Sequence, residues 1–333
     1  MRWPVRVLLC LAVILAAMGG AGWWAYRGLS QPGPAATPVT VVIPKGTSSS
    51  EIGRLLQEAG VVERSWMVPL AGQLDRRAPL KAGEYSFPPH ASVATAVDMM
   101  RRGQTVVHKL TVPEGLTVFQ ILAQLRQAAA LVGNAQPAPE DGSLLPQTYF
   151  YSFGDTRETL LARMTRAMNE AVDEMWPGRD PGLPLANKIE AITLASMVER
   201  ETAIAEERPH VAAVFYNRLK ARMKLQSDPT VIYALSNGEG ALERALTHED
   251  LGIRNPYNTY VVDGLPAGPI CNPGRASLMA VLHPVDSDDL YFVADGSGGH
   301  VFSRTLAEHN RNVGRLRRLE EGAEERAPAR RSR

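Results

Sequence analysis

A single apolar stretch organises the larger part of this chain: Ile189-Glu190-Ala191-Ile192-Thr193-Leu194-Ala195-Ser196-Met197-Val198-Glu199-Arg200-Glu201-Thr202. Its length and composition predict a buried helix from about Ala186 to Thr202. Such a helix has no structural need to end on Glu-Arg-Glu-Thr, because charges near a core are costly unless they are paired or used. A lone acid at the end of a buried helix is how some glycosidases place a general acid in a sugar cleft. The end of this stretch is therefore the first place to look for chemistry.

Two acids close the stretch, and helical geometry sets them apart. Residues two positions apart on a helix point about 200° away from each other. We therefore expect only one of Glu199 and Glu201 to face a cleft, which argues against a pair of catalytic carboxylates across one bond. The alternative is that both acids face solvent and form surface ion pairs, with Arg200 and Arg208, that contribute little to stability.

Two polar motifs follow the acidic end. The first is Leu225-Gln226-Ser227-Asp228-Pro229-Thr230-Val231-Ile232-Tyr233, in which Ser227 or Asp228 followed by Pro229 predicts a helix start. Its remaining polar residues offer amide and hydroxyl groups suited to sugar hydroxyls: Gln226, Thr230 and Tyr233. The second is the segment from Asn255 to Gly274, which is dense in proline and glycine and carries Tyr and Asn side chains. We expect a rigid loop that lines a binding site; the alternative is a well-packed crossover loop that binds nothing.

Composition excludes several classes of function. The chain has 333 residues and a formal net charge of +1, so it gives no reason to expect a nucleic-acid partner. Its seven histidines show no metal-ligand spacing, and no phosphate-binding loop, dinucleotide fingerprint or Gly-x-Ser-x-Gly motif occurs. We therefore expect neither a metal nor a cofactor. The two cysteines, Cys10 and Cys271, are placed too far apart for a disulfide.

The N-terminus is the most apolar part of the chain. Arg2 and Arg6 precede an uncharged run from Val7 to Trp24, which can just cross a hydrocarbon core of roughly 30 Å at 1.5 Å per residue. The flanking arginines favour a cytoplasmic start, and the tryptophans at the end of the run suit the far interface. We expect a single-pass signal anchor, with a cleaved signal peptide as the alternative. Either way, the residues from 30 onward would lie outside the cytoplasm.

Strand–turn–helix units follow a short linker at residues 31–38. Val42-Ile43-Pro44-Lys45-Gly46 leads into a helix near Ser50–Leu56, and Thr111-Val112-Pro113-Glu114-Gly115 leads into another near Phe119–Leu125. Both patterns predict a β-branched strand, a Pro-x-Gly turn and a helix capped by Ser or Thr. A looser copy precedes residues 93–100. Such units resemble LysM-type glycan-binding modules, and the alternative is a generic α+β spacer.

Several motifs occur in order along the chain: Leu145-Pro146-Gln147-Thr148-Tyr149, Ala195 to Thr202, Leu225 to Tyr233, Tyr257-Asn258-Thr259-Tyr260, Gly264-Leu265-Pro266-Ala267-Gly268-Pro269-Ile270, and Leu290 to Gly296. Together they resemble the membrane-anchored endolytic murein transglycosylases, also called YceG-like proteins, over nearly the whole sequence. Gln147 stands where that family usually has an acid, and Cys271 where it usually has a small residue.

The resemblance implies an α+β protein with a membrane anchor, a small LysM-like α+β module and a larger α+β lytic transglycosylase domain. The expected limits are 1–29 for the cytoplasmic start and anchor, 30–39 for the linker, 40–108 for the LysM-like module, 109–318 for the catalytic domain and 319–333 for a charged flexible tail. The implied location is the inner membrane, with the catalytic domain facing the periplasm. Peptidoglycan glycan strands are the implied substrate, and peptidoglycan synthases are candidate partners.

The implied reaction cleaves the β-1,4 bond between N-acetylmuramic acid and N-acetylglucosamine and leaves a 1,6-anhydromuramic end. One carboxyl suffices, because the C6 hydroxyl of the sugar is an intramolecular nucleophile. The resemblance assigns general acid/base catalysis to Glu201, with Glu199 as the alternative, and burial should raise the pKa of that acid. The expected substrate-binding residues are Gln226, Ser227, Asp228, Thr230, Tyr233, Asn258, Tyr260 and Tyr149.

Other functions remain open at this point. A hydrolysing muramidase would leave a reducing end, and a non-catalytic scaffold of cell-wall synthesis would bind glycan without releasing fragments. A lyase acting on a small chorismate-like substrate fits poorly with an anchored, outward-facing chain.

Overall fold

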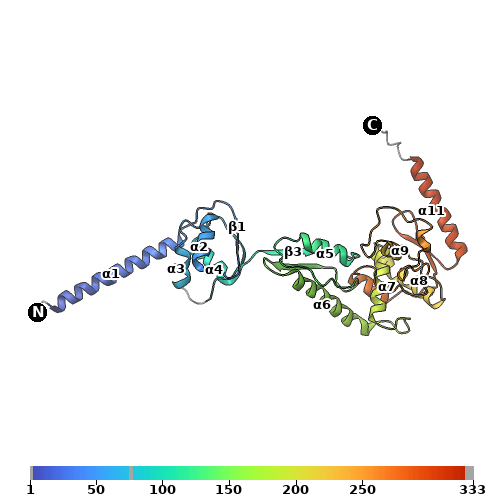
Figure 1. Cartoon of the computed structure of the whole chain (residues 1–333), viewed down its shortest axis with the longest axis horizontal. Coiled ribbons are helices and arrows are strands. Elements are labelled where there is room, and N and C mark those ends of the chain that lie inside the picture. The colour runs from blue at the N-terminus through green and yellow to red at the C-terminus, as the bar shows by residue number, and fades with distance from the viewer. Residues whose placement is uncertain (1–2, 75–77, 327–333) are drawn as a thin grey trace. The chain divides into compact units, whose positions relative to one another are not determined.

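A computed structural model of the chain describes residues 3–74 and 78–326. It divides into two compact units, one comprising the residues up to Lys109 together with Phe150–Asp155, the other comprising Leu110–Tyr149 together with Thr156 onward. The fold is mixed α+β, as expected, and the described strands form three two-stranded sheets (Figure 1).

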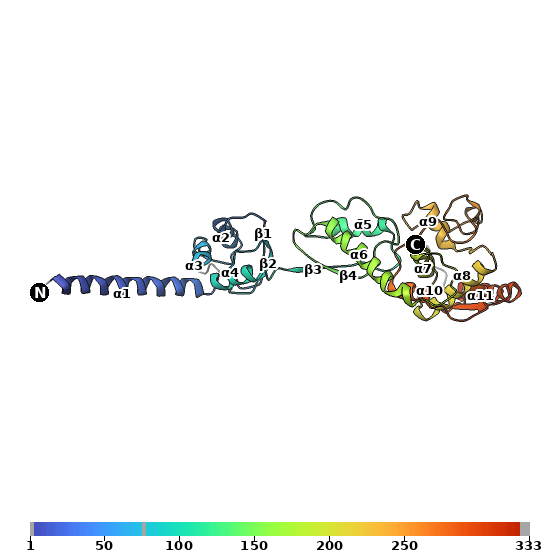
Figure 2. The ribbon, with the colours of Figure 1, turned by 90° about the horizontal axis from the view of Figure 1, so that it is seen from below.

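The first unit is built from strand–turn–helix units around one small sheet. Its elements are α1 (Trp3–Ser30), β1 (Val39–Ile43), α2 (Ser49–Glu58), α3 (Met67–Leu74), β2 (Gly83–Phe87) and α4 (Val93–Arg102). Strands β1 and β2 pair antiparallel, from Val39 opposite Phe87 to Ile43 opposite Gly83. The predicted cap of α2 is confirmed, because the hydroxyl of Ser48 accepts a backbone N–H of its first turn. The hydroxyl of Ser92 caps α4 in the same way. Figure 2 shows these helices beside the β1–β2 sheet.

The predicted membrane anchor falls within α1. Over the described residues, no helix combines the length and the hydropathy that a membrane crossing needs. Part of the predicted anchor lies outside the described residues: Met1 and Arg2, and the side chains of residues 3–6, 8–10, 21 and 25.

The second unit contains most of the helices. Strands β3 (Val107–Thr111) and β4 (Thr148–Ser152) form a two-stranded ribbon whose residues are divided between the two units. The helices and the closing hairpin are α5 (Val118–Gln127), α6 (Arg157–Met175), η1 (Trp176–Gly178), α7 (Lys188–Glu201), η2 (Ala205–Glu207), α8 (Arg208–Lys220), α9 (Asp228–Leu235), η3 (Asp250–Gly252), α10 (Arg275–Leu282), β5 (Tyr291–Ala294), β6 (His300–Ser303) and α11 (Leu306–Arg326). A capping box at Thr117 and Gln120 starts α5, so the second predicted strand–turn–helix unit is also confirmed.

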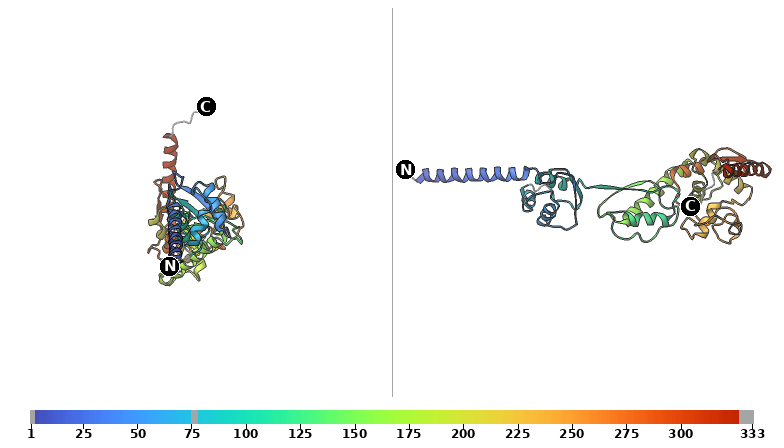
Figure 3. Two further views of the ribbon diagram at one scale, coloured as in Figure 1. Left: turned by 90° about the vertical axis from the view of Figure 1, so that its left-hand side faces the viewer. Right: turned by 90° about the horizontal axis from the view of Figure 1, so that it is seen from above.

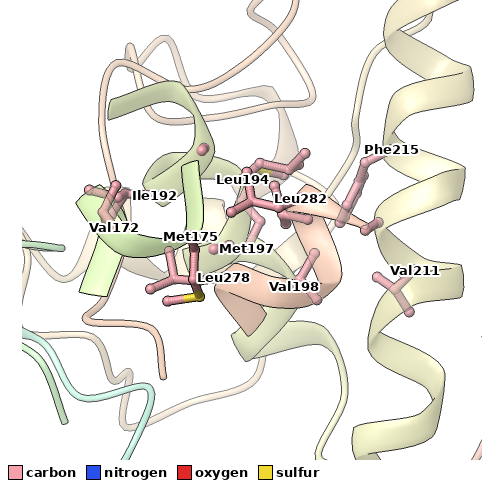
Figure 4. Packing of buried hydrophobic residues seen from close by; sticks show 14 of the residues in the cluster. Val172, Met175, Ile192, Leu194, Met197, Val198, Val211, Phe215, Leu278 and Leu282 are labelled. Atoms are coloured by element: carbon pink, nitrogen blue, oxygen red, sulfur yellow. The ribbon is translucent and has the colours of Figure 1, made fainter. Parts of the chain in front are cut away.

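Helix α7 lies at the centre of this unit. It begins after Asn187, whose side chain accepts the N–H of Glu190, and every residue from Ala191 to Val198 is buried. Figure 4 shows its side chains, among them Leu194 and Met197, packed against α6, α8 and α10. Fully burying a side chain of this size contributes about 1.5–3 kcal/mol. A helix that is buried all round places its last residues firmly, and these carry the two acids.

The C-terminal helix is longer than the sequence pattern predicted. We expected it over residues 305–318, followed by a flexible tail at 319–333, whereas α11 continues to Arg326. Residues 319–326 consist of good helix formers apart from one glycine, so no residue there stops the helix. The rest of the expected tail, 327–333, lies outside the described residues. Helix α11 packs along the β5–β6 hairpin (Figure 3).

Candidate active site

Glu201 ends α7 at a pocket of about 400 Å³. Thr202, the residue after it, adopts an extended backbone that stops the helix. The pocket is lined by side chains from α7, α8, α9, β5, α11 and two loops: Glu201, Arg218, Leu225, Gln226, Asp228, Tyr260, Phe292 and His309.

The carboxyl group of Glu201 is held by Ser227. The Oγ of Ser227 donates a hydrogen bond of 2.5 Å to Oε1 of Glu201. Burial raises the pKa of Glu201 from 4.5 to about 7, and the nearby negative charge of Asp228 acts in the same direction. The hydrogen bond from Ser227 and the positive charges of His300 and Arg218 lower that pKa. A carboxylic acid that is partly protonated near neutral pH meets the requirement for a general acid.

Glu199 points elsewhere and has an ionic partner. Its side chain is only 5% exposed, and its Oε1 lies 3.0 Å from Nη2 of Arg208. Its Oε2 accepts the backbone N–H of Gly274 at 2.9 Å, and Glu114 lies 3.5 Å from the same Arg208 nitrogen. Both carboxylate oxygens are therefore occupied, and Glu199 is not among the residues that line the pocket.

Arg218 supplies a buried positive charge at the pocket. Its side chain reaches from α8 between two backbone carbonyls: Nε donates to Leu290 O at 2.6 Å and Nη1 donates to Leu225 O at 2.8 Å. Its guanidinium also lies 5.3 Å from the ring centroid of Tyr291. Desolvation lowers the pKa of Arg218, yet an arginine stays charged in proteins. Arg218 therefore favours the ionised form of Glu201 without forming an ion pair with it.

A hydrogen-bonded pair, His300 and Glu207, lies beside the end of α7. The ring of His300 contacts Oε2 of Glu207 through Nδ1 at 2.7 Å, and the backbone N–H of His300 donates to Oε1 of Glu207 at 2.8 Å. The hydroxyl of Thr202 donates to the same Glu207 carboxylate at 3.0 Å. Desolvation raises the pKa of Glu207, but these hydrogen bonds and the electrostatic effect of His300 outweigh it, so the pKa is lowered overall. They connect the residue after Glu201 to strand β6.

Four of the expected binding residues come together near Glu201. Gln226, Asp228 and Tyr260 line the pocket, and Ser227 contacts the acid directly. The hydroxyl of Tyr260 donates to Oδ1 of Asp228 at 2.6 Å. Burial and the Asp228 charge raise the pKa of Tyr260, so it remains a neutral donor.

The other four expected binding residues have internal partners and do not line this pocket. Thr230 is fully buried and donates to Ser227 O at 2.6 Å. Asn258 is fully buried and donates to the carbonyls of Leu251 in η3 and Ile253 just after it. Tyr233 donates to Asp141 at 2.6 Å. Tyr149 donates to Leu145 O at 2.6 Å, and burial raises its pKa to about 12.

Sequence reasoning missed four residues that line the pocket: Arg218, Leu225, Phe292 and His309. Arg218 follows the apolar run of α8 in the sequence, but a cationic side chain on a helix usually faces solvent, so the pattern gave no signal that it lines a pocket. His309 lies in the first turns of α11 and carried no local signal. In the described part of the chain, no three His, Cys, Asp or Glu side chains come together as a metal site would require.

Comparison with known proteins finds relatives that carry the same name in two organisms. It is 31% identical over 307 residues to the endolytic murein transglycosylase of Bacillus subtilis strain 168, a match that covers 83% of this chain and 84% of that protein. It is 29% identical over 357 residues to the endolytic murein transglycosylase of Streptococcus pneumoniae serotype 2 strain D39, a match that covers 92% of this chain and 64% of that one.

A solved structure gives the same result for the fold. The 2.6 Å crystal structure of the putative yceG-like protein lmo1499 from Listeria monocytogenes matches with a TM-score of 0.52 and 31% identity, and the match covers 83% of this chain and 99% of that chain. The sequence model of the YceG-like family matches residues 41–315. This chain therefore belongs to the YceG-like family.

Proposed function

We propose that this chain is an endolytic murein transglycosylase. It cleaves the β-1,4 bond between N-acetylmuramic acid and N-acetylglucosamine in glycan strands and leaves 1,6-anhydromuramic ends, which terminates strand elongation. Membership of the YceG-like family and the names of the relatives support the reaction class. The observation that carries the assignment of the site is Glu201, a partly protonated acid at the edge of a pocket.

The chemistry follows from one carboxyl group. Protonated Glu201 donates its proton to the glycosidic oxygen as the bond to C1 breaks. The C6 hydroxyl of the same muramic residue attacks C1, an intramolecular step that needs no positioned water. The Glu201 carboxylate then accepts the proton of that hydroxyl and is restored as an acid. Because Glu201 must begin protonated, activity should fall as the pH rises through its pKa, about 7.

The test is product analysis on purified, uncrosslinked glycan strands. The wild type should release fragments with 1,6-anhydro ends, and Glu201→Gln should release none while retaining its folded circular dichroism spectrum. Glu206→Gln is the matched control, since Glu206 is an exposed carboxylate near α7. An active Glu201→Gln variant would overturn the assignment, and loss of activity in a folded Glu199→Gln variant would move it to Glu199.

A hydrolysing muramidase is the second candidate, because one observation favours it. Asp228 places a second carboxylate in the same pocket as Glu201, and hydrolytic glycosidases use two. Its Oδ1 accepts the hydroxyl of Tyr260, however, so that oxygen is already engaged. Reducing ends in the mass spectrum, together with an inactive Asp228→Asn variant, would establish hydrolysis; anhydro ends from that variant would exclude a nucleophilic Asp228.

We propose further that the chain is held at the inner membrane by its N-terminal helix, with the catalytic unit facing the periplasm. The uncharged run from Val7 to Trp24 supports this location, as do exposed apolar side chains along α1 such as Ile14 and Met18. Full-length chain should resist extraction from membranes by alkaline carbonate, whereas a chain lacking residues 1–29 should not pellet with them. Peptidoglycan synthases, which make the substrate, are the partners that this location would favour.

The LysM-like part, residues 40–108, is proposed to bind glycan. A non-catalytic scaffold would bind strands through this part and release no fragments. Pelleting of the Glu201→Gln variant with insoluble peptidoglycan separates the two properties, because binding should survive while release is lost.

A further inference from the structure

Ser227 occupies the N-cap position of α9 but its side chain does not cap that helix. Serine at an N-cap normally accepts a backbone N–H from the first turn, whereas no such bond forms here. Pro229 has no N–H to offer, and the N–H of Thr230 is accepted by the Ser227 carbonyl at 3.1 Å. The hydroxyl of Ser227 is therefore not needed for capping, and it donates to Glu201.

The backbone of Ser227 is fixed by two buried threonines. Its N–H donates to Oγ1 of Thr259 at 2.9 Å, and Oγ1 of Thr230 lies 2.9 Å from the same atom. Thr230 also donates to the Ser227 carbonyl and accepts the N–H of Thr259. All three residues are at most 2% exposed. This closed network explains why Thr230 and Thr259 do not line the pocket.

The residue before Ser227 is held in a strained conformation. Gln226 has a φ of 52°, in the left-handed region that few non-glycine residues adopt. Its N–H donates to the carbonyl of Thr259 at 3.2 Å. The sharp turn at Gln226 thus delivers Ser227 to the end of α7, where its hydroxyl meets Oε1 of Glu201.

We propose that Ser227 is a positioning residue for the general acid: its hydroxyl engages Oε1 of Glu201 and so reserves Oε2 for proton transfer to the glycosidic oxygen. Ser227 donates to Oε1 whether Glu201 is ionised or carries its proton on Oε2, so the contact persists through both halves of the reaction. The inference rests on the proposed function and extends it to the choice of oxygen.

The pH dependence of Ser227 variants has a definite sign. A hydrogen bond donated to a carboxylate favours its ionised form, so its loss raises the pKa of Glu201. Other charged or titratable groups act on Glu201 or share its pocket, and Ser227→Ala leaves all of them in place: Asp228, Arg218, His300, Tyr260 and His309. The alkaline limb of the rate profile should therefore move to higher pH in the Ala variant.

The experiment compares Ser227→Ala, Ser227→Cys and Ser227→Thr with the wild type on glycan strands. Ala and Cys should lower kcat about tenfold to a hundredfold at the plateau, as misplacement of a reacting group does, with KM unchanged and the alkaline limb shifted upward. Cys keeps nearly the volume of serine and is a weak donor, so it keeps the test valid if Ala does not fold. Thr retains the hydroxyl and should restore the wild-type limb.

Thr156→Ala is the matched control for helix capping. Thr156 caps α6 by accepting the N–H of Thr159 at 3.0 Å, so this variant should lose stability without a shift of the alkaline limb. Wild-type kcat and limb in Ser227→Ala would overturn the proposal, and so would a raised KM with unchanged kcat, which would make Ser227 a substrate ligand. If the wild type itself gave no anhydro ends, the proposed function would fail instead.

Discussion

Replacing Glu201, the proposed general acid, should make the protein more stable, and by an amount that depends on pH. The pKa of Glu201 is raised from 4.5 to about 7 in the folded chain. Between these values the unfolded chain loses its proton first, so a rising pH favours unfolding. At 1.36 kcal/mol per pKa unit, the folded state loses about 3 kcal/mol once the pH is well above 7. A glutamine side chain cannot ionise, and the Glu201→Gln variant therefore avoids this loss.

Calorimetry of both proteins at pH 4 and pH 8 measures the effect. At pH 4 both forms are neutral, so the two free energies of unfolding should nearly agree. At pH 8 the Glu201→Gln variant should be more stable by about 3 kcal/mol, which for a unit of this size corresponds to roughly 6–12 °C in Tm. The Glu206→Gln control should show no such difference. An equal difference at both pH values, or a less stable variant at pH 8, would refute the argument.

Three further changes test the surroundings of the site. Arg208→Met leaves the buried carboxylate of Glu199 without its partner and should cost about 3–5 kcal/mol in urea unfolding; a loss below about 1 kcal/mol would contradict a structural role. Gly274→Ala would place a Cβ 1.8 Å from Oε1 of Glu114, and calorimetry should show a loss of about 1–3 kcal/mol. Asp228→Asn removes a charge that raises the pKa of Glu201, so the alkaline limb of activity should move to lower pH; an upward movement would be evidence against that coupling.

The helices around the site were predictable because the apolar pattern is strong. The buried run before Glu199 predicted α7, and the helical repeat predicted that the two acids diverge, as the structure confirms. Periodicity could not show which acid meets the pocket, because that depends on Arg208 and Ser227, which follow α7 in the chain. Only in the folded chain does Glu199 meet the cation of Arg208 and Glu201 the hydroxyl of Ser227.

Polar residues in the two motifs that follow α7 were the weakest basis for prediction. Asn258 and Thr230 carry the amide and hydroxyl groups that a sugar site would use, yet both satisfy neighbouring backbone groups instead. Buried loops need such partners, because an unpaired backbone group is costly. Arg218 was missed for the opposite reason, since a long cationic side chain on a helix usually faces solvent.

The buried thiol of Cys271 offers a way to measure how often the loop that carries it separates from α7. Its Sγ donates to the carbonyl of Ser196 at 3.3 Å, and burial raises the pKa of the thiol well above its usual value. A maleimide reagent can therefore modify it only when the loop carrying it separates from α7. In a chain whose other cysteine, Cys10, is replaced by serine, the modification rate would report how often this loop separates from α7, the helix that carries Glu201. The measurement needs no substrate.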